Sequence, residues 1–248
     1  MRFDIVTIFP ELFAPFLTSG VTRRAFESGQ VDARLSNPRD FAAGNYKRID
    51  DRPFGGGPGM VMMAEPLSQC LANIQLQRAD GAPVVLFSPI GKPLNHTMVA
   101  QWAQSKGAIL ICGRYEGVDQ RFIDAHVTEQ ISLGDFVLSG GEIAAMALLD
   151  AVARLQPGVL NSDESHLQDS FNPELDGLLD CPHYTRPELW AGSAVPDVLL
   201  SGHHAQIERW RRDQRLQLTA KHRPELLVTA DKAGRLTAQD QAFLRRED

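Results

Sequence analysis

Short runs rich in β-branched residues alternate with segments of helical periodicity over roughly the first 155 residues. The strand-like runs are FDIVTI (3–8), VDARLS (31–36), VVLFS (84–88), AILIC (108–112) and EQISL (129–133). The helical segments between them cover residues 21–28, 66–78, 95–105 and 118–125. This alternation is typical of βαβ units, in which each helix returns the chain to the next parallel strand. It predicts an α/β domain with a mostly parallel sheet.

The segment 142–155 shows the helical period most clearly. Its apolar residues recur at helical spacing, at Ile143, Met146, Leu149, Val152 and Leu155. Glu142 lies in the first turn, where the helix dipole favours an acidic side chain. The stretch SLGDFVLSGGE (132–142) therefore joins a strand to a helix, on the side of an open α/β sheet where ligands bind.

Three strand ends carry glycine-marked loops, namely FSPIGKP (87–93), CGRYEG (112–117) and SLGDFVLSGGE (132–142). Glycine lets a ligand approach the main chain closely, although a glycine turn also forms without any ligand. Neighbouring strands bring such loops to one edge of a sheet, so we expect one pocket lined by all three. The 132–142 stretch lacks the glycine spacing and the Lys-Ser/Thr pair of common phosphate-binding loops, which argues against a polyphosphate ligand. A fourth glycine-rich stretch, RPFGGGPGM, covers residues 52–60.

The pattern changes at residue 156. Residues 156–177 have no sustained period and are rich in Asp, Ser, Asn, Pro and Gly, which predicts an interdomain linker. Two helical segments follow, HHAQIERWRRDQRLQLTAKH (203–222) and AQDQAFLRRED (238–248). We therefore expect a small helical second domain.

Composition narrows the protein class. With 248 residues and 43% hydrophobic content, the chain is long enough for a substantial core. No apolar run is long enough to span a bilayer, and Asp4 and Pro10 interrupt the start where a signal peptide needs an apolar region. The three cysteines fit neither a disulfide framework nor a zinc pattern. These features predict a cytoplasmic protein with no membrane partner.

The net charge of −6 is unevenly distributed. An acidic middle region, 112–180, is followed by a basic segment, 202–223, which contains RWRRDQR. Such a run is as typical of a solvated helix face as of a phosphate-binding surface. Nearby, Trp190, Trp210 and Tyr184 are candidates for stacking on bases, although large aromatic residues are more often core residues.

Taken together, six motifs resemble the bacterial tRNA (guanine-N1-)-methyltransferases, which methylate the guanine just 3′ of the anticodon (position 37). They are DDRPFGGGPGM (50–60), SPIGK (88–92), CGRYEGVDQR (112–121), SLGDFVLSGGE (132–142), DSF (169–171) and GLLDCPHYTRP (177–187). The similarity extends from the first strand to about residue 227. Residues 161–168 and the tail after 228 carry little of it.

The resemblance implies a fold and an assembly. It implies a SPOUT-type parallel sheet with a C-terminal trefoil knot in a cofactor-binding domain (1–159), a flexible linker (160–176) and a small helical tRNA-binding domain (177–248). It also implies a homodimer whose active sites are shared between subunits. Periodicity alone predicts only an ordinary doubly wound sheet, since true knots are rare.

S-adenosyl-L-methionine is the methyl donor that the resemblance implies. The residues expected to bind it are Leu86, Phe87, Ser88, Pro89, Gly91, Gly113, Tyr115, Glu116, Ser132, Leu133, Gly134, Asp135, Phe136, Val137, Leu138, Gly140 and Gly141. The glycines among them would let backbone groups close around the ligand, and the apolar residues would supply the contacts usual in small-molecule sites.

Methylation at guanine N1 requires removal of its proton, and the resemblance makes Asp169 the general base. Without it, an aspartate in a polar linker would be assigned to a turn. Arg154 is the candidate for stabilising the negative charge that develops on O6, although a cation near a helix C-terminus also suits the dipole. Glu116 and Asp119 are open to several roles: holding the guanine amino edge, balancing the sulfonium charge, or binding a divalent ion.

The expected partner is tRNA. Its candidate contacts are Asp50, Arg52, Gly55 and Gly59 near the target base, and Arg209, Arg211, Arg212 and Arg215 at phosphates. The family's activity is associated with Mg²⁺, but the sequence shows no metal motif. Two other functions remain open on the sequence: an RNA-binding regulator without catalysis, and a metal-dependent phosphohydrolase.

Overall fold

The computed structural model describes residues 1–161 and 166–247. The chain divides into two compact units, Met1–Asn161 and a second that begins at residue 162, and each is described by itself. Of the predicted linker, residues 162–165 lie outside the described part of the chain.

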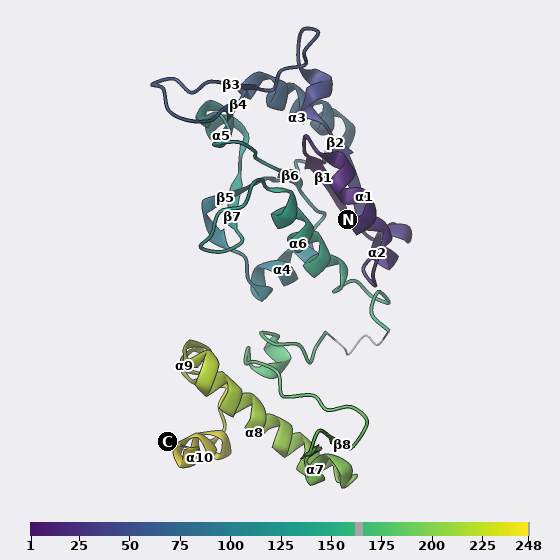
Figure 1. Cartoon of the computed structure of the whole chain (residues 1–248), viewed down its shortest axis with the longest axis vertical. Helices are drawn as coiled ribbons and strands as arrows, with labels where there is room; N and C mark the ends of the chain where they lie inside the picture. Colours follow the sequence, from purple (N-terminus) through teal and green to yellow (C-terminus); the bar gives the residue numbers. More distant parts are fainter. Residues whose placement is uncertain (162–165, 248) are drawn as a thin grey trace. The chain divides into compact units, whose positions relative to one another are not determined.

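The N-terminal unit is built on a five-stranded parallel sheet (Figure 1). Its strands, in spatial order, are β2 (Asp32–Ser36), β1 (Arg2–Val6), β6 (Ile109–Ile111), β5 (Val84–Pro93) and β7 (Glu129–Ser132). The helices are α1 (Phe13–Thr18), α2 (Arg23–Glu27), α3 (Ala64–Arg78), α4 (His96–Ala103), α5 (Gln120–His126) and α6 (Glu142–Ala153). Short 3-10 turns cover Pro10–Leu12 and Pro38–Phe41. The predicted α/β class with a parallel sheet is confirmed.

The strands bury both faces of the sheet, which explains their nearly continuous apolar sequence. Side chains alternate between the faces, so Val85 and Leu110 join one core with helices α4 and α6, whereas Leu86 and Ile111 join another with α3 and α5. The sheet therefore forms the middle of three layers.

Strand β5 departs from the sequence prediction. The predicted loop at 87–93 is part of this strand, whose pairing with β7 shifts between Phe87 and Lys92. A Cβ atom at Gly91 would lie 2.5 Å from the backbone of Gln130 on β7. The glycine is thus explained by a close approach of two strands, and residues 88–91 form a bulge between the two paired stretches of β5.

A small antiparallel hairpin, β3 (Asp50–Asp51) and β4 (Val61–Met62), belongs to the same unit. The backbone N–H of Met62 donates to the carbonyl of Gly117 over 2.9 Å, and that of Asp119 donates to the Met62 carbonyl at the same distance. These bonds attach the hairpin to the chain that follows β6.

The second unit contains the antiparallel pair β8 (Leu189–Trp190) and β9 (Ser193–Ala194) and the helices α7 (Asp197–Leu200), α8 (His204–His222), α9 (Pro224–Lys232) and α10 (Ala238–Glu247). A 3-10 turn covers Pro173–Leu175. The apolar core of the second unit is small, with Leu178, Leu216 and Ala230 fully buried. Helix α9 and the pair β8–β9 were not foreseen from the sequence. Among the described residues, no helix is long and apolar enough to cross a bilayer.

Candidate functional site

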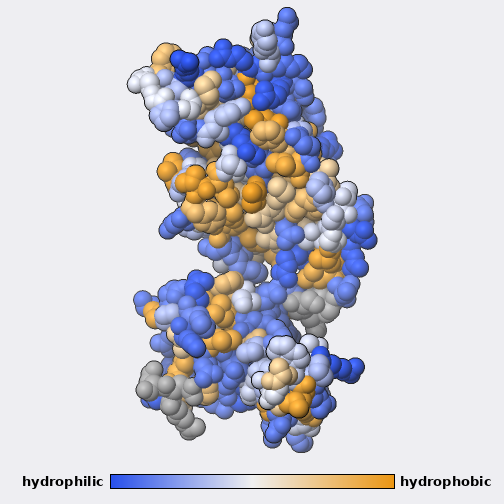
Figure 2. All heavy atoms as spheres, viewed as in Figure 1, coloured by the Kyte–Doolittle hydropathy of each residue, from blue (hydrophilic) through white to orange (hydrophobic). Residues whose placement is uncertain are grey.

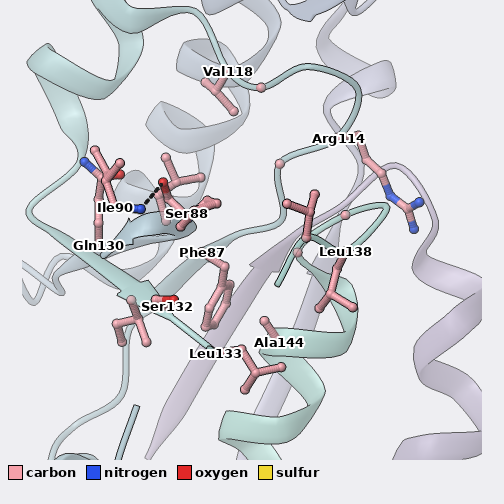
Figure 3. Close-up of a pocket in the computed structure, with 18 of the residues that line it drawn as sticks. Phe87, Ser88, Ile90, Arg114, Val118, Gln130, Ser132, Leu133, Leu138 and Ala144 are labelled. Atoms are coloured by element: carbon pink, nitrogen blue, oxygen red, sulfur yellow. Dashed lines mark hydrogen bonds between the residues drawn. The ribbon is translucent and has the colours of Figure 1, made fainter. Parts of the chain in front are cut away.

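A cavity of about 370 Å³ lies where the bulged part of β5 meets the carboxyl ends of β6 and β7 (Figure 3). Its walls come from residues 86–90, the loop after β6 and the loop after β7, together with the first turns of α5 and α6. Its size is in the range usual for small-molecule sites. The prediction that these three segments line one pocket is therefore confirmed.

The pocket has an apolar floor and a polar backbone rim. In Figure 3, Phe87, Leu133, Leu138 and Ala144 gather around the lower part of the cavity. Ser132 bonds through its hydroxyl to the backbone of Gly134 and so shapes the start of the loop after β7. Of the residues predicted to bind the cofactor, all but Gly91 and Asp135 line this cavity.

Two glycines of the loop after β7 lie against the loop after β6. The N–H of Gly141 donates to the carbonyl of Gly113 over 3.0 Å, and a Cβ atom on Gly141 would lie 2.8 Å from Cα of Cys112. A Cβ atom on Gly140 would collide with the Arg114 side chain. These glycines are needed for the close packing of the two loops, and both also line the cavity, so their contact with the cofactor stays a prediction.

A buried group of polar side chains braces this junction and was not predicted. The Glu142 side chain is 1% exposed, accepts a 2.8 Å hydrogen bond from Thr7 and lies 2.9 Å from Nε of Arg114. The pair is angled so that Nε of Arg114 and Oε2 of Glu142 do not hydrogen-bond to each other. The Arg114 guanidinium also donates to the Ser139 carbonyl over 3.2 Å and lies over the Phe9 ring. Figure 3 shows Arg114 directed away from the cavity centre, so its role is to connect the two loops.

The glycine-rich stretch 52–60 ends beside the pocket. The N–H of Glu116 donates to the Met60 carbonyl over 2.9 Å, and a Cβ atom on Gly59 would collide with the Glu116 side chain. Glu116 lines the cavity, and its neighbour Tyr115 has a left-handed backbone with φ of 60°. For a bulky residue this conformation is strained, and such strain is often found at ligand sites.

Asp119 does not face the pocket. Its carboxylate caps α5 by accepting from the N–H of Arg121 and pairs with that guanidinium at 2.6 Å. The hydrogen bond from Arg121 lowers the pKa of Asp119. Asp119 therefore stabilises the start of α5. This position is explained without a role in holding the guanine, balancing the sulfonium charge or binding a divalent ion.

The three cysteines are buried free thiols. Burial raises the pKa of Cys70 to about 12, with a further contribution from Asp40, and raises that of Cys112 well above its usual value. Thiols in this state are poor nucleophiles. Covalent catalysis by cysteine is not expected here.

Arg154 caps the C-terminal end of α6 and is half-buried. Ala144, which lines the pocket, lies at the other end of that helix. Ten residues separate the two positions, or about 15 Å along a helix. Arg154 consequently does not belong to the pocket of its own chain.

Asp169 belongs to the C-terminal unit and is half-buried in a well-defined turn. The buried Asn172 donates from its side chain to the His166 carbonyl over 2.9 Å and from its backbone N–H to the Asp169 carbonyl over 3.2 Å. Phe171 has a left-handed backbone, with φ of 71°, and its N–H donates to the Leu178 carbonyl. These hydrogen bonds join the DSF segment to the residues on either side of it.

Three of the four arginines predicted to bind phosphates are engaged within the C-terminal unit. Arg209 and Arg212 both donate to Asp240, whose side chain is 1% exposed, over 3.1 and 3.0 Å. Arg215 is 8% exposed and reaches Asp180 over 3.4 Å. Each of these positive charges has an acidic partner inside the unit, and their contact with phosphates stays a prediction. Arg211 is more exposed, and its ion pair with Glu208 lies on the surface.

Comparison with known proteins identifies the family of this chain. The family model described as tRNA (Guanine-1)-methyltransferase TrmD matches residues 1–229. The chain belongs to this methyltransferase family. It is 78% identical over 244 residues to the tRNA (guanine-N(1)-)-methyltransferase of Albidiferax ferrireducens, covering 98% of each chain. It is 70% identical over 248 residues to the protein of the same name from Polaromonas sp. JS666, and 56% identical over 248 residues to that from Bordetella pertussis, with at least 96% of each chain covered.

Membership of the methyltransferase family confirms the resemblance stated from the sequence motifs. Several pocket residues were nevertheless not predicted, namely Ile90, Arg114, Gly117, Val118, Gln120, Ile123, Gln130, Ile131, Ser139 and Ala144. Arg114, Val118 and Ser139 lie inside two of the six sequence motifs, so their place in these motifs could have identified them as pocket residues. Ile123 and Ala144 lie on helices, and only the fold brings them to the cavity.

Proposed function

We propose that this protein transfers the methyl group of S-adenosyl-L-methionine to N1 of the guanine just 3′ of the anticodon of tRNA (position 37). The observation that carries the proposal is the cavity formed by residues 86–90 of β5 and the loops that follow β6 and β7 in a member of this methyltransferase family. The sequence left an RNA-binding regulator and a phosphohydrolase open. A formed ligand pocket favours an enzyme over the regulator.

The cavity suits S-adenosyl-L-methionine. Phe87, Leu133 and Leu138 provide apolar contact for the adenosine, and the backbone groups of residues 133–141 provide polar contacts of the kind that read the edge of a base. Glu116 supplies a carboxylate at the wall, which complements a sulfonium charge. When bound, this cofactor supplies an electrophilic methyl group.

Within the proposal, Asp169 takes the N1 proton of guanine, because N1 has no available lone pair until that proton leaves. The hydrogen bond that the Asp169 carbonyl accepts from the Asn172 N–H supports this role, because it helps to position the backbone of the proposed base. Arg154 then stabilises the negative charge shared between N1 and O6. Alignment of N1 with the methyl group accounts for the remaining acceleration.

We propose that the active site is shared between two copies of the chain. Arg154 lies about 15 Å along α6 from the pocket-lining Ala144, a distance that an arginine side chain does not span. It reaches a guanine only if that guanine occupies the pocket of a second chain. The same dimer would bring Asp169 from the partner. In this arrangement one chain supplies the cofactor loops of each active site, and the other chain supplies Asp169 as the general base.

Further parts of the proposal concern fold and partners. After β7 the chain returns past β5 to the loop after β6, where Arg114 and Gly140 form an isolated bridge, and this crossing supports a trefoil knot. The domains proposed are a cofactor-binding domain (1–159), a linker (160–176) and a tRNA-binding domain (177–248), acting in the cytoplasm. Among the described residues, no group of three or more His, Cys, Asp or Glu side chains could hold a metal ion, so no step is assigned to Mg²⁺.

The test is a methyl-transfer assay with labelled S-adenosyl-L-methionine. The substrates are a tRNA transcript with guanine just 3′ of the anticodon and a matched transcript with adenine there. Label should enter only the first, and nuclease digestion followed by mass spectrometry should identify N1-methylguanosine. Release of phosphate without methyl transfer, or methylation at another atom, would contradict the proposal.

A further inference from the structure

Phe54 is completely exposed, at 100%, on the loop that joins β3 to β4 (Figure 1). The three residues that follow it, Gly55, Gly56 and Gly57, all have positive φ, and a Cβ atom on any of them would have nothing within 4 Å. The loop therefore holds an aromatic ring in solvent with no packing of its own. Figure 2 shows apolar side chains at several places on the molecular surface, and a single one is ordinary on a protein. What distinguishes Phe54 is the place where it is held.

The loop is anchored beside the pocket. Its C-terminal end is fixed by the bond between the Glu116 N–H and the Met60 carbonyl, and β4 is fixed by the bond between Met62 and Gly117. Six residues separate Phe54 from Met60, so the ring lies within roughly 20 Å of the pocket wall even if the chain between them is extended. Arg52, two residues before Phe54, is exposed as well.

The proposed reaction requires this neighbourhood to accept RNA. A base held between its neighbours in the anticodon loop cannot enter a protein cavity, so the target guanine must leave the stack before its N1 reaches a methyl group bound there. Extrusion breaks stacking on both sides of the base. Proteins that bind unstacked RNA commonly replace a lost stack with an aromatic side chain and place a cation near the adjacent phosphate.

We propose that Phe54 stacks on the anticodon-loop base adjacent to the extruded guanine, with Arg52 at the neighbouring phosphate. This inference rests on the proposed tRNA substrate and adds a contact to it. Stacking on an aromatic ring is tolerant of base identity. Phe54 thus contributes to RNA affinity and to keeping the target base extruded, while the cofactor pocket is unaffected.

The experiment compares four variants: Phe54→Ala, Phe54→Leu, Phe54→Trp and Leu76→Ala. Leu76, on α3, is the matched control because it is an apolar residue that is 85% exposed. The Phe54 ring packs against nothing in the unit, so we expect all four to fold. Two readouts are taken: steady-state kinetics with full-length tRNA, and binding to an anticodon stem-loop with 2-aminopurine on the 5′ or the 3′ side of the target, whose fluorescence falls when it stacks.

Phe54→Ala should raise KM for tRNA by about 5- to 150-fold, the range of one base–aromatic stack. KM for S-adenosyl-L-methionine and kcat should change less than about twofold, because the stack is made equally in the ground and transition states. Phe54→Leu should resemble Phe54→Ala, whereas Phe54→Trp and Leu76→Ala should resemble the wild type. The 2-aminopurine signal should be quenched at one of the two positions by the wild type, Phe54→Trp and Leu76→Ala, and not by Phe54→Ala or Phe54→Leu.

An unchanged KM for tRNA in Phe54→Ala would overturn the inference, as would equal quenching by all variants. A change in oligomeric mass with unchanged RNA affinity would also overturn it and make Phe54 a protein contact. The binding readout does not depend on methyl transfer. If the wild type failed to methylate guanine yet quenched 2-aminopurine through Phe54, the proposed function would fail while the stacking contact stood.

Discussion

Adjacent arginines on α8 provide a sharp test of which positive charges face RNA. We consider Arg212→Gln and, as its matched control, Arg211→Gln. Arg212 donates to Asp240 over 3.0 Å and to Asp176 over 2.7 Å, and its side chain is 18% exposed. Arg211 pairs with Glu208, and the two side chains are 39% and 61% exposed. The same chemical change is thus made once in a buried network and once on the surface.

The structure sets the expected magnitudes. Breaking a buried ion pair by removing one partner costs about 3–5 kcal/mol. Asp240 would keep its bonds from Arg209 and from the N–H of Thr237, so we expect a cost near the lower end, about 3 kcal/mol. An exposed pair such as Arg211–Glu208 contributes about 0–1 kcal/mol. The two variants should therefore differ clearly in stability.

Hydrogen exchange on the full-length protein measures the first effect. A loss of about 3 kcal/mol corresponds to roughly 150-fold faster exchange of protected α8 amides in Arg212→Gln, and Arg211→Gln should exchange like the wild type. The salt dependence of tRNA binding measures the second effect. If Arg211 contacts a phosphate, its loss should lower the slope of log affinity against log salt by about 0.7–0.9.

The reasoning would be refuted if Arg212→Gln kept the α8 protection of the wild type and lowered the salt slope, since Arg212 would then be a phosphate contact. An unchanged slope in Arg211→Gln would remove Arg211 from the proposed RNA surface.

The other predictions concern the pocket, acid stability and the dimer. Gly140→Val should weaken cofactor binding in calorimetry by displacing Arg114 from between the two loops, and unchanged affinity in a folded variant would contradict that. Burial acts to raise the pKa of Asp240, but the hydrogen bonds from Arg212 and Thr237 lower it to about 2. Because the folded pKa lies below the unfolded value of about 3.9, ionised Asp240 should add roughly 2.5 kcal/mol to the free energy of unfolding above pH 4. This stabilisation should be lost as the pH falls from about 4 to 2. In Asp240→Asn, hydrogen exchange measured along an acid titration should no longer show that loss. Refolding a mixture of Asp169→Asn and Gly140→Val should restore about a quarter of the active sites in a two-fold dimer, whereas background activity in mass-confirmed heterodimers would exclude a shared site.

Periodicity was sufficient for the parallel sheet, because alternating strands and helices leave few other arrangements. It could not reveal the continuation of β5 through residues 88–93, since a proline and a glycine there read as a turn. The glycine at 91 is required by a strand that lies next to it only in the fold.

The buried ionic groups explain the remaining differences. The position of Glu142 in the sequence predicts only a favourable interaction with the helix dipole. Its partners in the fold, Thr7 and Arg114, follow strands β1 and β6, and Thr7 is 135 residues away in the sequence. The basic run on α8 looked like a solvated or phosphate-binding face because Asp240, its acid partner, is 28 residues beyond Arg212. Local sequence shows a charge but not the distant residue that neutralises it.

The place of β1 in the sheet has a consequence for how the chain folds. Strand β1 pairs with β6, which follows it by more than one hundred residues, and the pocket is complete only when α6 is present as well. Pairings between distant segments make folding slow, because a long loop must close before the contacts form. During synthesis the first strand must therefore wait with one edge unpaired until about residue 111 has left the ribosome, and the pocket is completed only after about residue 153 has followed. Substitutions at the β1–β6 contact should accordingly lower the yield of folded protein more than they alter the activity of the molecules that do fold.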